Sequence, residues 1–154
     1  MRLSPHFSEA EYCASDTAAR LGIDNSLPMI YMQNAHDACA ALERIRAHLT
    51  VITGHTIPII VSSGYRCLEL NSAIGSNPSS DHTRALAADI KAPEFGTPLE
   101  LAKALAPVMG VLQLGQVIYE FGSWVHISVR QPEKYDNRLL TITAKGTQFG
   151  IVET

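Results

Sequence analysis

Residues 62–90, SSGYRCLELNSAIGSNPSSDHTRALAADI, are the stretch around which the rest of the chain is organised. They contain His82 and Asp89 with six residues between them, and a further histidine, His126, follows in the apolar run WVHIS. Imidazole nitrogen and carboxylate oxygen are common zinc ligands, and a catalytic zinc site uses three protein ligands. His82, Asp89 and His126 are therefore candidate ligands of one Zn²⁺ ion.

Asp89 is the most informative of the three, because it lies in an apolar run between Ala88 and Ile90. Burying a lone carboxylate is costly, so such groups are normally paired or bound to a metal. The alternatives are a hydrogen-bonded structural aspartate and packed histidines, since the spacing of His82 and Asp89 is by itself a loose pattern. These residues alone leave both interpretations open.

A longer ordered pattern extends through this stretch and beyond it. Its parts are Ser-Gly-Tyr-Arg at 63–66, Asn71, Gly75, Ser-x-His at 80–82, Ala-x-Asp at 87–89 and Trp-x-His at 124–126. The pattern resembles the zinc D-Ala-D-Ala carboxypeptidase family, which includes L-alanyl-D-glutamate endopeptidases of bacteriophages and shares its zinc fold with the hedgehog signalling domain. Residues 3–25 are similar to the opening of a small phage and prophage branch, so the resemblance covers nearly the whole chain.

The resemblance implies roles for four residues of this sequence. His82, Asp89 and His126 would bind zinc, and Arg66 would bind substrate and help to stabilise the oxyanion formed during hydrolysis. A fixed guanidinium directed at a developing negative charge is physically suited to that role. Without the motif, the simplest interpretation of a single arginine is a surface ion pair.

The sequence also departs from the family pattern in places. Ala85 replaces a usual glycine, and Ser76 replaces a second glycine after Gly75. Better-known members place an acidic or histidine base closer to the last ligand, where this chain has Phe121 and Ser123. None of these changes removes a ligand, but the last one puts the identity of the base in question.

Glu120 is the candidate general base, and its role depends on the turn of a predicted hairpin. Residues 116–121 and 124–129 are strand-like runs separated by a glycine and a serine. A three-residue loop would set Glu120 opposite Trp124 and on the face of His126, at a diagonal of roughly 7–8 Å between α-carbons. A two-residue loop would turn Glu120 away and leave it facing solvent.

The chain of 154 residues predicts one domain, residues 1–154, of the α+β class, with a small antiparallel sheet and flanking helices. The leader, residues 3–25, is expected to wrap over the core without contact with the site. The expected elements are a short helix from the Ser8 capping box to Gly22, a main amphipathic helix at 29–49, a buried strand at 57–61, a short helix at 67–74, a helix from Thr97 to Gly110, a turn at 135–138 and a short strand at 139–144.

Composition limits the partners of the protein. Hydrophobic residues make up 46%, charged residues 18%, and the net charge is −3, which disfavours nucleic acid as a partner. No apolar run is long enough to span a membrane, and the N-terminus lacks the pattern of a secretory signal, so synthesis as a cytoplasmic protein is expected. A cell-wall substrate would then be reached by host lysis or by carriage in a virion, with virion proteins as partners.

Taken with the resemblance, these features predict a zinc metallopeptidase that cuts peptidoglycan stem peptides. A catalytically silent domain of the same fold, which binds cell wall or serves in a phage tail, is the main alternative. A zinc-stabilised interaction module is a third, and it would need a fourth protein ligand. Whether the bond is cut by a carboxypeptidase or an endopeptidase stays open.

Overall fold

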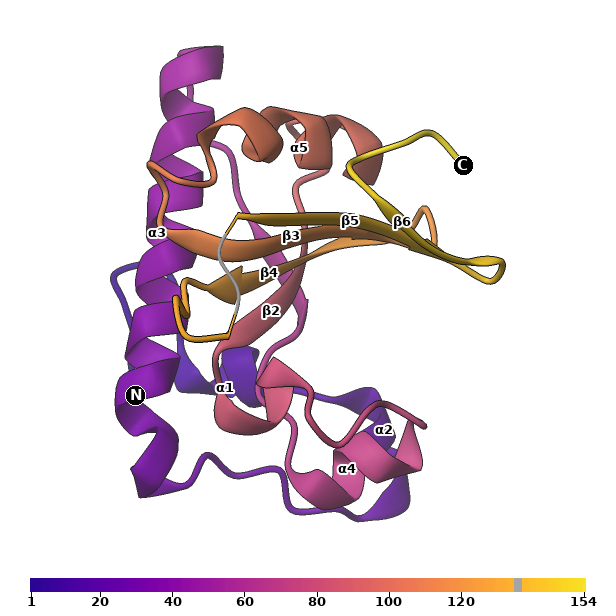
Figure 1. Cartoon of the computed structure of the whole chain (residues 1–154). Helices are drawn as coiled ribbons and strands as arrows, with labels where there is room; N and C mark the ends of the chain where they lie inside the picture. The colour runs from indigo at the N-terminus through magenta and orange to yellow at the C-terminus, as the bar shows by residue number, and fades with distance from the viewer. Residues whose placement is uncertain (135–136) are drawn as a thin grey trace.

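The computed structural model describes residues 1–134 and 137–154, which are built around one sheet (Figure 1). Its six strands lie in the order β1-β2-β4-β3-β5-β6. Neighbours are antiparallel except β3 and β5, which are parallel. The strands are β1 (Ile60–Ser63), β2 (Ala87–Lys91), β3 (Leu114–Glu120), β4 (Trp124–Val129), β5 (Arg138–Thr143) and β6 (Gly146–Phe149). The α+β class is confirmed, with a parallel pair in a sheet that was expected to be antiparallel throughout.

The helices divide into two groups. α3 (Met32–Thr53) crosses one end of the strands and α5 (Pro98–Leu105) covers the sheet, and apolar residues of both helices form one core with β2, β3 and β4 (Figure 1). Three shorter helices, α1 (Glu9–Cys13), α2 (Asp16–Leu21) and α4 (Leu68–Ala73), are grouped on the side of β2 away from α5 (Figure 1). The capping boxes predicted at Ser8 and Thr97 both form, and each begins its helix.

The two faces of the sheet have different roles, because successive side chains of a strand point to opposite faces. Ala88 and Ile90 of β2 and Val125 and Ile127 of β4 belong to the core under the helices. The residues between them, including Asp89, point to the other face. The alternation of side chains along each strand therefore gives the sheet one face that packs in the core and one face that carries the candidate site residues.

The leader and the first strand differ from those expected, and an expected turn is described only in part. The leader forms two helices, because Ser15 accepts a hydrogen bond from Ala18 N–H and caps a second helix that ends at Gly22. The strand expected at 57–61 begins only at Ile60 and is a half-exposed edge strand, since Pro58 has no N–H for pairing. Of the turn expected at 135–138, residues 135 and 136 lie outside the described residues.

The described residues contain no helix that is both long and apolar enough to span a membrane.

Candidate active site

Three different elements bring the candidate metal ligands together. His82 lies in a 3-10 turn, Asp81–Arg84, just before β2, while Asp89 is in β2 and His126 is in β4. Asp89 and His126 are direct partners in the antiparallel register, so their side chains stand next to each other on the face away from the helices. All three residues are buried.

The ligand atoms converge closely. His82 Nε2 lies 3.2 Å from Asp89 Oδ1 and 3.2 Å from His126 Nδ1, and His126 Nδ1 lies 3.0 Å from the same Asp89 oxygen. Ligands bound tetrahedrally to zinc at about 2.0–2.1 Å stand about 3.3 Å apart, so this separation is close to that of a zinc site. The structure therefore brings the three predicted ligands into one group that could hold a metal ion.

The hydrogen-bonding partner of His82 tests whether a cation fits this site. His82 Nδ1 lies 2.6 Å from the Gly64 carbonyl oxygen, which can only accept, so Nδ1 carries the proton. In the neutral ring, Nε2 then presents a lone pair to Asp89 Oδ1 at 3.2 Å. Two lone pairs in a buried site repel each other, and a cation between them converts that repulsion into coordination. The donor set fits zinc.

His126 is held from the opposite side of its ring. Its Nε2 lies 2.9 Å from the Ser128 hydroxyl, which can accept a hydrogen bond from Nε2–H. In that arrangement the other nitrogen, Nδ1, faces the cluster and is the one that can bind a metal. Arg84 and Lys134 hold Asp81 at 2.6 and 2.9 Å.

The charges within the cluster set the protonation of each ligand. Burial lowers the pKa of His82, which favours the neutral ring. Burial would raise the pKa of Asp89, but its hydrogen bond with His126 helps to hold it well below its usual range, and the carboxylate stays ionised. Burial would likewise lower the pKa of His126, but its hydrogen bond with Asp89 raises it, so a metal ion must displace a proton there.

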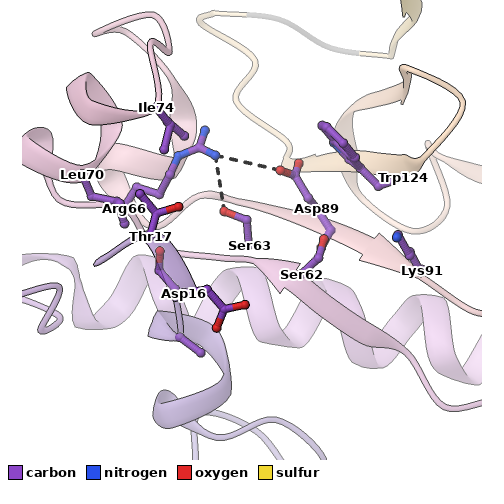
Figure 2. Close-up of a pocket in the computed structure, with 12 residues that line it drawn as sticks. Asp16, Thr17, Ser62, Ser63, Arg66, Leu70, Ile74, Asp89, Lys91 and Trp124 are labelled. Carbon is purple, nitrogen blue, oxygen red and sulfur yellow. Dashed lines mark hydrogen bonds and ion pairs between the residues drawn. The ribbon is translucent and has the colours of Figure 1, made fainter. Parts of the chain in front are cut away.

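Arg66 lies beside Asp89 and is largely buried. Its guanidinium lies 4.0 Å from Asp89 Oδ2 and donates to Ser63 at 3.3 Å (Figure 2). It also donates to Ser80 at 3.3 Å. Its Nε donates to Asn71, whose own side chain donates to the Asn77 carbonyl. Three neutral oxygens thus fix the cation beside the metal ligands, which excludes the surface ion pair considered above.

Glu120 reaches the cluster because the hairpin has the longer of the two possible loops. Glu120 pairs with Trp124 across a three-residue loop, and Phe121 and Gly122 take the left-handed φ values of 53° and 64°. Its Oε1 lies 3.8 Å from His126 Nδ1. Burial raises the pKa of Glu120, and proximity to His126 offsets part of this rise. The residue thus stands where a base would be needed, and its catalytic role stays a prediction.

The arrangement of these groups can be compared with known families. The family model described as peptidase M15 matches residues 5–128 of the chain. The chain belongs to the peptidase M15 family. This is a family of zinc-dependent metallopeptidases, and the match includes Arg66, Glu120 and all three candidate ligands. No curated protein matches the sequence.

The M15 match begins in the leader, and the leader contacts the site, contrary to our expectation. Tyr12 of α1 donates its hydroxyl proton to the Ala87 carbonyl in β2, at 2.8 Å. The Tyr12 carbonyl accepts from Tyr65 N–H at 2.9 Å, so α1 is bonded both to β2 and to the residue after Gly64, whose carbonyl supports His82. The expectation failed because an amphipathic pattern shows that a helix packs but not which loop it packs on.

Sequence reasoning also missed two supporting groups of the M15 site, Ser128 and the Gly64 carbonyl. Ser128 is two residues after His126, so alternation along β4 places both side chains on one face. That signal was present and could have identified Ser128. Nothing in the sequence could have identified a backbone carbonyl as the partner of His82.

Proposed function

We propose that this protein is a zinc peptidase that hydrolyses a peptide bond in peptidoglycan stem peptides. The observation that carries the proposal is the convergence of His82 Nε2, Asp89 Oδ1 and His126 Nδ1 within 3.2 Å of one another, with a carboxylate and a guanidinium beside them. Membership of the M15 family supports zinc as the metal and the cell wall as the source of substrate.

Zinc would be held by the two imidazoles and Asp89, where it would supply a Lewis acid and lower the pKa of water. Glu120 takes a proton from the attacking water at its carboxylate and returns it to the leaving amine nitrogen as the C–N bond breaks. Burial raises the pKa of Glu120, and a higher pKa makes its carboxylate a stronger base for the first step. Arg66, fixed by Ser63, Ser80 and Asn71, stabilises the negative charge on the carbonyl oxygen.

Digestion of isolated peptidoglycan sacculi by zinc-loaded protein tests this function. Soluble fragments should be released and identified by mass, and release should stop on chelation. Glu120→Gln should keep its zinc and lose about 2–4 powers of ten in rate, while the exposed Glu94→Gln control should retain full activity. Zinc-loaded protein that leaves sacculi intact would instead support the silent domain of the same fold.

We also propose a phage or prophage setting, supported only by the resemblance of residues 3–25 to phage and prophage members. In that setting the enzyme is made inside the host and reaches the wall at lysis or from the virion. Cells that express the protein should then lyse only after the inner membrane is permeabilised. Lysis without permeabilisation would contradict this proposal.

A further inference from the structure

Two cavities flank the metal-ligand cluster on opposite sides. The first, here called the leader-side cavity, has a volume of about 460 Å³ and is lined by Asp16 and Thr17 of α2 together with Arg66, Asp89, Lys91 and Trp124 (Figure 2). The second, the sheet-side cavity, has a volume of about 380 Å³ and is lined by Ser80, Ile118, His126, Leu140, Ile142 and Thr147. Neither cavity is enclosed.

The cavities meet at the reactive groups. Asp89 lines one and His126 lines the other, and their ligand atoms are 3.0 Å apart. Arg66 on the leader side donates to Ser80 on the sheet side at 3.3 Å. A chain that enters one cavity and crosses the cluster therefore continues directly into the other.

One wall of the sheet-side cavity is formed by strands beyond the family match. Leu140 and Ile142 belong to β5 and Thr147 to β6, whereas the M15 match ends at residue 128. The wall on this side is therefore a feature of this chain rather than of the matched region. Arg66 and Lys91 line the leader side, so a carboxylate of a substrate meets cations there, whereas Lys134 on the sheet side is paired with Asp81 at 2.9 Å.

We propose that the protein is an endopeptidase, which binds an acidic peptide across both cavities and cuts a bond with substrate residues on each side. This inference rests on the proposed peptidase function. A carboxypeptidase needs a groove that ends one residue beyond the cut bond. Here each side offers several hundred Å³, the range of pockets that enclose whole ligands.

Two forms of one substrate test the inference directly. A peptidoglycan stem pentapeptide is supplied with a free C-terminal carboxylate or with a C-terminal amide, and the products are identified by mass. An endopeptidase should cut both forms at the same internal bond. Release of only the C-terminal residue, abolished by the amide, would overturn the inference and leave the peptidase function standing. Failure of zinc-loaded protein to cut these peptides or sacculi would overturn both.

Cavity-filling variants provide a second test with matched controls. Thr17→Trp fills the leader-side cavity and Thr147→Trp fills the sheet-side cavity. The controls are Ala19→Trp, on the helix that contains Thr17, and Gln148→Trp, on the opposite face of the strand that contains Thr147. Ala19 and Gln148 line other cavities. Both filled variants should lose about tenfold or more in kcat/KM on sacculi, with both controls unchanged. Loss in only one filled variant would point to an exopeptidase and overturn the inference.

Discussion

Each imidazole of the cluster has a partner on its second nitrogen, and the two partners differ. A backbone carbonyl, Gly64 O, holds Nδ1 of His82, while a hydroxyl, that of Ser128, holds Nε2 of His126. The two rings therefore present opposite nitrogens to the same point. The sequence predicted which residues meet there, but the choice of nitrogen depends on contacts between segments far apart in the chain.

Ser128→Ala should weaken zinc binding about 10–100-fold, the usual cost of losing the partner of a ligating histidine. Without the hydroxyl, His126 is free to change its tautomer and its ring orientation. Competition with a chelator of known affinity measures the change, with the exposed Ser72→Ala as the control. Equal affinity in both variants would show that Ser128 does not orient the ring.

At the scale of elements, the leader supports the loop that holds His82. Gly64 packs so closely on α1 that an added Cβ would overlap the Tyr12 carbonyl oxygen and its ring. A backbone oxygen cannot move aside as a flexible side chain can. The glycine of the Ser-Gly-Tyr-Arg motif is thus explained by packing against a helix more than fifty residues earlier in the chain.

Gly64→Ala should destabilise the fold by about 3 kcal/mol, near the upper end for an overpacked site, and lower Tm by roughly 6–12 °C. Thermal unfolding of the variant measures this. Gly110→Ala is the control, since its Cβ would make only ordinary contacts at 3.7 Å and beyond. If Gly64→Ala and Gly110→Ala have the same Tm, α1 does not pack on this loop as described.

The first residues of the chain are attached to α3 by Glu43. Ser4 Oγ and His6 N–H donate to one oxygen of Glu43 at 2.7 and 2.8 Å, and His6 Nδ1 lies 2.8 Å from the other. Partial burial alone would raise the pKa of Glu43, but these hydrogen bonds hold it below its usual value. The carboxylate therefore stabilises the folded state.

Because the pKa of Glu43 is lower when folded, its contribution is fully present above the pKa of the unfolded chain, about 4.3, and is lost as pH falls through the folded value. Glu43→Gln should cost about 1 kcal/mol near pH 7, where the side chain is partly exposed, and progressively less below about pH 4. Urea unfolding across this range measures the difference from the unsubstituted protein. A cost that does not depend on pH would contradict this account.

Glu120 shows how one turn can decide a site. The sequence left two loop lengths open, and Gly122-Ser123 alone favours a two-residue turn. In the observed three-residue loop, Phe121 takes a left-handed conformation that is uncommon for an aromatic residue. Local turn preferences therefore favour the loop that is not observed. Packing fixes it instead, since the Phe121 and Trp124 rings lie 5.6 Å apart.

At the scale of the whole molecule, the predictions that succeeded were those set by local pattern. Capping boxes fixed the starts of α1 and α5, and the motif order named three residues that meet in one cluster. The predictions that failed required pairing between distant segments: the parallel alignment of β5 with β3, the edge position of β1, and the contact of the leader with the site. None of these contacts produces a repeating pattern of apolar and polar residues in the sequence.

The central claim is that His82, Asp89 and His126 form one metal centre, and zinc content tests it most directly. Protein purified without added metal and reloaded with zinc should hold about one ion per chain after dialysis. His126→Ala should hold none, while His48→Ala, which lies on α3 away from the cluster, should match the unsubstituted protein. Zinc retained in full by His126→Ala, or absent from all three proteins, would contradict the account.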